Sequence, residues 1–249
     1  MEEVGLLLCG HKNTAGIAKG ALDQLYASIV NFSSKSLRYL REPKSEESMS
    51  FGPFCARVLL ENSCAALVAR LDCFRMMYLS EFQSQPTYNI GKRARSAFAW
   101  SGDVFPEQKA PNSLWNPEHD VERIDRALFS EYLNHLYWRP AVTMMLDFIA
   151  GYSNDPALSE MLLVPPEGFM SSVRGRGQQL YSILSKGVHW EFFSSSLMLD
   201  DLTIKESIRD TCLMIGGLGL ASHFIPTAYA SLQPSEAVDA YIAFRKVLA

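Results

Sequence analysis

The sequence predicts an all-α protein, and three observations carry that prediction. Apolar residues recur near the 3.6-residue period of a helix, start and stop signals bracket these stretches, and no stretch alternates as a strand does. We find no internal repeat and no long linker. We therefore expect a single domain over residues 1–249, a bundle of about seven or eight helices with one long irregular loop region at about residues 83–116; a chain of two parts is the alternative.

The first half of the chain predicts two long helices. Residues 13–40 carry apolar side chains at helical spacing, and Pro43 lies just beyond them. Residues 44–50 are polar, which indicates a loop. Residues 51–82 give the strongest helical pattern, with Pro53 in the first turn and Pro86 beyond the end, so one continuous helix is expected.

Proline and glycine punctuate residues 83–116, which predicts loop with one short basic helix over residues 90–100. Asn116 followed by Pro117 is a typical helix start, and that helix is expected to reach Trp138, where Pro140 ends or bends it. Further helices are expected over these ranges: 141–150, a short one from 155, a long one from 165 toward residue 189, 203–225 and 235–248.

Composition excludes a disordered chain and a globally basic one. Apolar residues make up 48% and charged residues 20%, and the formal charge is -4, so nucleic acid would need a local basic patch. The longest apolar run, residues 211–225, is too short to cross a bilayer, so we expect no membrane span and a cytoplasmic protein. Gly216-Gly217-Leu218-Gly219 follows no strand, which favours close helix packing over a phosphate loop.

Neither a metal nor another cofactor is expected. The five cysteines are an odd number without a Cys-x-x-Cys pair, and we interpret them as small apolar core residues. The chain also lacks the Glu-x-x-His pairs of di-iron bundles and the His-Glu-x-x-His helix of zinc hydrolases. His223, in an apolar run, is interpreted as a hydrogen-bonded core residue.

One set of polar residues could carry acid–base chemistry. Tyr181, Ser185 and His189 are spaced four apart and share a helix stripe. Arg57 and Glu61 lie four apart on an unusually apolar helix, where a charged pair is costly unless each group finds a partner. If the two helices pack together, these residues form either a structural network or a catalytic site.

The same two segments resemble the HEPN-like superfamily. Arg57-Val58-Leu59-Leu60-Glu61 is similar to an R-x-L-L-E helix, and the segment from Leu184 to His189 is similar to an L-S-x-x-V-H helix. The resemblance implies an antiparallel helical bundle, homodimerisation, and a role in toxin–antitoxin or antiviral systems. Many members are metal-independent RNases that use an Arg four to six residues before a His. Here Ser185 and Lys186 stand where that Arg is expected, so only His189 carries over.

Two groups of basic residues could contact nucleic acid. Lys92, Arg93 and Arg95 precede Trp100, which could stack on a base while the cations bind phosphate. Arg174 and Arg176 lie beside flexible glycine backbone. For both groups the alternative is a solvated helix surface.

Three functions follow as hypotheses. The first is a helical subunit that binds a protein partner or forms a homo-oligomer, in a bacterial antiviral-defence or toxin–antitoxin assembly, without chemistry of its own. Aromatic residues would form its interface (Tyr88, Phe98, Trp100, Phe105, Trp115, Tyr137, Trp138), unless they cap the core. The second is a metal-independent RNase that uses His189 and a remote Arg57. The third is a small-molecule-binding α-domain.

Overall fold

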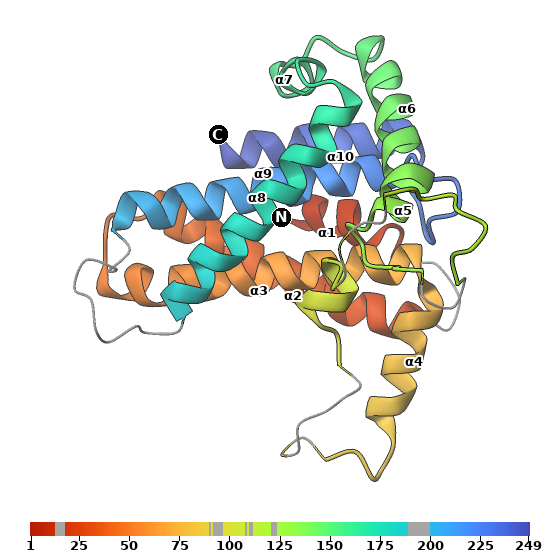
Figure 1. Cartoon of the computed structure of the whole chain (residues 1–249). Helices are drawn as coiled ribbons and strands as arrows, with labels where there is room; N and C mark the ends of the chain where they lie inside the picture. Colours follow the sequence, from red (N-terminus) through yellow and green to blue (C-terminus); the bar gives the residue numbers. More distant parts are fainter. Residues whose placement is uncertain are drawn as a thin grey trace.

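The computed structural model describes residues 1–12, 18–89, 91, 97–107, 109, 112–120, 124–188 and 200–249. These residues confirm the all-α prediction, and the part of the chain so described contains no β-strand (Figure 1). The helices are α1 (Glu2–Cys9), α2 (Lys19–Arg41), α3 (Glu46–Leu71), α4 (Cys73–Ser84), α5 (Glu131–Leu133), α6 (Arg139–Ala150), α7 (Pro156–Leu162), α8 (Pro166–Val188), α9 (Asp201–Ser222) and α10 (Pro234–Leu248), with a π-helical turn η3 (Asn134–Trp138). The turn η1 (Trp100–Val104) has non-helical backbone angles at Ser101 and Gly102.

Helix α3 is the centre of the bundle. It packs against α2, α8 and α9, and α8 crosses it obliquely in Figure 1. Small and apolar side chains occur on all its faces, as expected of a helix surrounded by others. Its residues Ala56, Leu60 and Ala66 are fully buried and share one core with apolar residues of the helices on every side.

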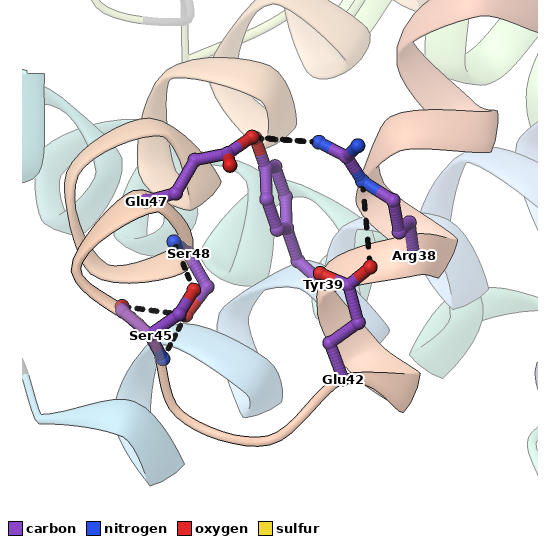
Figure 2. A network of polar contacts seen from close by, with 6 residues as sticks. All are labelled: Arg38, Tyr39, Glu42, Ser45, Glu47 and Ser48. Atoms are coloured by element: carbon purple, nitrogen blue, oxygen red, sulfur yellow. Dashed lines mark hydrogen bonds and ion pairs between the residues drawn. The ribbon is translucent and has the colours of Figure 1, made fainter.

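Polar contacts fix the turn between α2 and α3 (Figure 2). Ser45 and Ser48 form a capping box, in which each side chain accepts from the other residue's backbone N–H at 3.0 Å. Arg38 donates from α2 to Glu47 at 2.8 Å, and the hydroxyl of Tyr39 donates to the same carboxylate oxygen at 3.3 Å. These contacts hold the N-terminus of α3 antiparallel to the end of α2.

The expected single helix over residues 51–82 is wrong in two respects. Helix α3 begins earlier, at Glu46, within the stretch expected to be a loop. It ends at Leu71, where Asp72 leaves the helical conformation (φ -134°, ψ 74°) and caps α4 by accepting from the backbone N–H of Arg75 at 3.2 Å. Helix α4 therefore starts in a new direction and extends away from the other helices (Figure 1).

The N-terminal segment forms a helix that the sequence did not predict. Helix α1 packs against α2, α9 and α10, and Val4, Leu7 and Leu8 are fully buried. It approaches α9 closely because Gly219 has no side chain: a Cβ there would lie 3.0 Å from the Cβ of Leu7 and 3.2 Å from its carbonyl group. This contact confirms the interpretation that the glycines of residues 216–219 permit close helix packing.

The helix expected to start at residue 117 begins fourteen residues later, at Glu131, where Ser130 caps it by accepting from the backbone N–H of Leu133. The described residues between 116 and 130 form turns and irregular backbone instead. Pro140 does not end the helix: it stands in the first turn of α6, directly after the π-helical turn η3.

The expected helices from residue 141 onward agree with the structure to within a few residues; α8, α9 and α10 begin at Pro166, Asp201 and Pro234. The short basic helix expected over residues 90–100 lies mostly outside the described residues, and residues 97–99 are not helical. Four cysteines are buried among apolar side chains and Cys73 is half-buried, as expected of small core residues. Within the described ranges, every helix is too short or too polar to serve as a bilayer span.

Candidate functional site

Helices α3 and α8 pack together, as the polar-network hypothesis required, and Arg57 lies between them. Its Nε donates to Glu61 at 3.1 Å and one of its terminal nitrogens donates to the hydroxyl of Tyr181 at 3.0 Å. Its guanidinium carbon also lies 4.6 Å from the centroid of the Tyr181 ring. A buried charge needs such partners, and the neighbouring helix supplies one of them.

Trp100 completes this group. Its indole ring stacks on Tyr181 with 4.2 Å between centroids and 8° between planes. Tyr181 therefore contacts both the Trp100 ring and the Arg57 guanidinium. Ser185 is on the same helix, but its hydroxyl donates to the backbone carbonyl of Tyr181 at 2.6 Å. The structure therefore joins Arg57, Glu61, Tyr181 and Trp100, which we call the Tyr181 clamp.

The Tyr181 clamp attaches the segment that contains η1 to the long helices. The same segment is also held by Asp103, which accepts from Arg75 at 2.8 and 3.1 Å and from the backbone N–H of Ala99 at 2.8 Å. His189 lies outside the described residues, and so do Lys92, Arg93 and Arg95. A catalytic role for His189 and a basic patch beside Trp100 stay predictions.

Arg174 and Arg176, expected beside a nucleic acid, each face a carboxylate. Arg174 forms an ion pair with Glu131 and donates to the carbonyl of Ser130 at 3.0 Å, and Arg176 forms an ion pair with Asp210. Each cation is therefore compensated locally, which lowers its attraction for phosphate. Nucleic-acid binding by these two residues stays a prediction.

Sequence reasoning missed a buried polar centre at the end of α3. The Arg70 side chain is almost fully buried, yet none of its five hydrogen-bond partners is a carboxylate. Nε donates at 2.9 Å to one carbonyl, and the terminal nitrogens donate to a second carbonyl, two hydroxyls and an imidazole nitrogen. These acceptors belong to Tyr229, Leu7, Ser222, Ser231 and His223. An Arg among Ala and Leu residues late in an apolar helix was the available signal.

His223 is a hydrogen-bonded core residue, as predicted. Its Nδ1 accepts from Arg70 at 3.1 Å and from the backbone N–H of Leu232 at 3.0 Å, so the ring proton is on Nε2, which donates to the carbonyl of Leu7 at 2.9 Å. Burial and the neighbouring Arg70 charge hold the pKa of His223 well below its usual value. Burial also lowers the pKa of Arg70 to about 10, which leaves it charged at neutral pH.

Helix α4 presents an aromatic face to solvent. Phe74, Tyr78 and Phe82 are spaced four apart and are 72%, 49% and 44% exposed. Successive rings lie 6.4 and 6.2 Å apart with planes inclined by only 30° and 28°, and Tyr88 meets Phe82 edge-on at 6.3 Å. We call Phe74, Tyr78 and Phe82 the α4 aromatic face. The inner side of the helix is anchored by Met76 and Leu79, which are buried.

Several aromatics expected at an interface belong to the core instead. Phe105 and Trp138 are buried, and the Trp138 indole donates to the carbonyl of Leu128 at 2.8 Å. Trp100 and Tyr137 are partly buried against the core, and Trp115 is 57% exposed. Sequence reasoning missed the α4 aromatic face because the pattern of residues 51–82 predicts one continuous helix whose apolar side chains face the core.

Among the described residues, no group of three or more His, Cys, Asp or Glu side chains is placed to bind a metal ion. Comparison with protein-family models, with curated proteins and with solved structures finds no match to this chain. The geometry of its own residues is therefore the basis for a functional conclusion.

Proposed function

We propose that this chain is a helical partner-binding protein, and that its α4 aromatic face inserts into an apolar groove of another protein. The observation that carries the proposal is the exposure of three aromatic rings, one helical turn apart, on a helix that extends from the bundle. Water-soluble monomers seldom leave such a continuous apolar patch uncovered. Aromatic residues are also enriched among those that dominate interface energies.

The spacing of the rings indicates how the partner binds. Anchors at positions i, i+4 and i+8 lie along one side of a helix, which is the pattern of a helix that docks into a groove. Each aromatic side chain can bury roughly 150–250 Å².

The charge of α4 indicates the chemistry of that groove. The helix has two charged residues, Arg75 and Glu81, and Arg75 already binds Asp103 through two hydrogen bonds. The aromatic face therefore offers a partner ring surface and almost no uncompensated charge. A groove lined by aliphatic and aromatic side chains fits this face, whereas a strongly charged one would lose hydration without gaining an ion pair.

The resemblance to the HEPN-like superfamily adds a biological setting to the proposal. In that setting the chain is a non-catalytic subunit of a bacterial antiviral-defence or toxin–antitoxin assembly. The sequence has no Arg four to six residues before His189, which supports a binding role over RNA cleavage. Arg57, the remote Arg that would have to take its place, is already held by Glu61 and Tyr181.

The test compares two triple variants in affinity capture from the native host. Phe74→Ala, Tyr78→Ala and Phe82→Ala together remove the aromatic face. Met144→Ala, Leu163→Ala and Leu202→Ala remove three exposed apolar side chains elsewhere (50%, 83% and 66% exposed) and serve as the matched control. Circular dichroism and denaturation first establish that both variants fold.

We expect a stoichiometric partner with the wild type and with the control, and its loss with the aromatic-face variant. With purified partner, Kd should rise by at least about 100-fold, which corresponds to about 3 kcal/mol. Equal capture by all three proteins would overturn the proposal. So would binding of the wild type, but not the aromatic-face variant, to anionic lipid vesicles in a flotation assay without any protein partner.

A further inference from the structure

The α4 aromatic face is nearly symmetric about its central residue. Phe74 and Phe82 lie four residues before and after Tyr78. The ring centroids of Phe74 and Tyr78 are 6.4 Å apart with 30° between planes, and those of Tyr78 and Phe82 are 6.2 Å apart with 28° between planes. Reversing the direction of the helix therefore exchanges the two outer rings and leaves their spacing almost unchanged.

A surface with this symmetry fits a second copy of itself. In a two-fold dimer both subunits use the same patch, so the patch must be complementary to itself. If two copies of α4 pack in opposite directions with their Tyr78 residues at the same height, Phe74 of each copy lies level with Phe82 of the other. Aromatic rings attract one another in edge-on and offset arrangements. The three rings of one copy can therefore cover the three rings of the other.

The two charged residues of α4 favour this antiparallel pairing over a parallel one. Arg75 and Glu81 lie three residues before and after Tyr78. Antiparallel pairing sets Arg75 of one copy level with Glu81 of the other across the contact, whereas parallel pairing sets like charges level with each other. Because Arg75 already binds Asp103, these charges select the direction of pairing and add little affinity.

The position of α4 leaves its aromatic face accessible to a second copy. The helix extends away from the other helices, and its three rings are 72%, 49% and 44% exposed (Figure 1). Met76 and Leu79 are buried and attach the helix to the bundle, so pairing through the aromatic face leaves these contacts intact. Antiparallel pairing also places the two bundles toward opposite ends of the paired helices.

The area of the contact indicates a weak, reversible dimer. Burying one aromatic ring completely removes roughly 150–250 Å² from water, and the three rings are already partly covered in the single chain. The six rings of a pair therefore contribute on the order of 600 Å². Stable complexes bury at least about 1,200 Å², and smaller contacts are typical of transient association. We expect a Kd on the order of 10 μM.

We infer that two copies of this chain cover each other's α4 aromatic faces in an antiparallel two-fold dimer when no other protein occupies them. The dimer keeps the rings out of water, and another protein can bind the same rings only after the dimer dissociates. This competition rests on the proposed partner-binding function, whereas the dimer itself does not.

Sedimentation equilibrium of the purified full chain tests the dimer in the absence of any other protein. Between about 1 and 200 μM, the wild type should change from mostly monomer to mostly dimer. The aromatic-face variant should have a Kd at least about tenfold higher, and the matched control should dimerise as the wild type does. A wild type that stays monomeric at about 200 μM overturns the inference. Equal dimerisation of the wild type and the aromatic-face variant overturns it as well.

Distances between spin labels test the direction of pairing. A nitroxide is attached at Gln85→Cys, at the exposed end of α4, with Cys73→Ser because Cys73 is only half-buried. Antiparallel pairing places the two labels at opposite ends of the contact, roughly 20 Å apart along the helix axis, whereas parallel pairing brings them level. Labels closer than about 15 Å would contradict the antiparallel arrangement. Dilution with unlabelled chain should remove the signal, which confirms that it arises between two copies.

The protein captured from the native host tests the competition. Added to the dimer during sedimentation, it should give a complex with one copy of each chain. A complex that retains two copies of this chain would show that the two contacts do not compete. If no protein is captured but the wild type dimerises, the partner-binding proposal fails and the dimer stands. A captured protein together with a monomeric wild type gives the opposite result, so the two failures are distinguishable.

Discussion

The indole ring of Trp100 lies nearly parallel to the phenol ring of Tyr181 with 4.2 Å between centroids, and the guanidinium carbon of Arg57 lies 4.6 Å from the same Tyr181 centroid. These contacts join η1 to α8 and α3, three elements far apart in the sequence. They explain why a Tyr occurs at position 181: the ring stacks, and the hydroxyl accepts from Arg57.

Substitutions of Tyr181 should separate these two roles. Tyr181→Phe keeps the stack and removes one hydrogen bond, so the free energy of unfolding should fall by about 1 kcal/mol. Tyr181→Ala also removes the ring and should cost about 3 kcal/mol or more. Urea denaturation followed by circular dichroism measures both values. Equal losses for the two variants would show that the ring stack contributes nothing.

Arg70 should be far more sensitive to substitution than exposed arginines. Arg70→Met keeps the length and apolar stem but leaves carbonyl, hydroxyl and imidazole acceptors buried without their donor. We expect a loss of more than about 3 kcal/mol in the free energy of unfolding. Arg139→Met, at a half-exposed ion pair with Glu167, is the control and should change stability by less than about 1 kcal/mol. Similar losses in chemical denaturation would contradict this assignment.

Stability should decline as pH falls below about 6.5, the usual pKa of a histidine. The folded state holds the pKa of His223 well below that value, so the unfolded chain binds a proton that the native protein does not. The stabilisation from unprotonated His223 is fully present above the pKa that this histidine has in the unfolded chain. As the pH falls further, the free energy of unfolding decreases by up to about 1.4 kcal/mol per pH unit.

His223→Gln tests the source of that decline, since an amide can donate and accept but does not titrate here. Denaturant unfolding of both proteins between about pH 5.5 and 7.5 should give a steeper dependence for the wild type. Parallel curves would assign the acid sensitivity to other groups.

Gly219 and Gly175 should respond in opposite directions to the same substitution. Gly219→Ala places a methyl group 3.0 Å from the Cβ of Leu7 and 3.2 Å from its backbone carbonyl, so α1 and α9 must move apart. A loss of about 1–3 kcal/mol is expected. Gly175→Ala meets nothing within 4 Å inside α8, and better helix propensity should stabilise the protein by about 1 kcal/mol. Thermal unfolding of the two variants measures whether close packing or helix propensity determines the change in stability at each position.

Local signals in the sequence predicted much of the bundle. Pro166, Asp201 and Pro234 open helices close to where cap and proline signals placed them, and the Arg57–Glu61 pair led to the contact with α8. The helix expected at residue 117 failed because Asn116 uses its side chain in a turn instead, accepting from the backbone N–H of Glu118 at 3.0 Å. Asn-Pro favours both outcomes, and only tertiary contacts select one.

The sequence by itself determined the all-α class, most helix positions and the burial of the cysteines and His223, because these follow from periodicity, caps and the cost of exposing apolar groups. Tertiary structure alone decided which apolar side chains stayed exposed. Asp72 ends α3 while Arg126 binds its carboxylate at 2.8 Å, and that change of direction carries Phe74, Tyr78 and Phe82 away from the core. Burial depends on where a helix points after a break, and one-dimensional periodicity contains no such information.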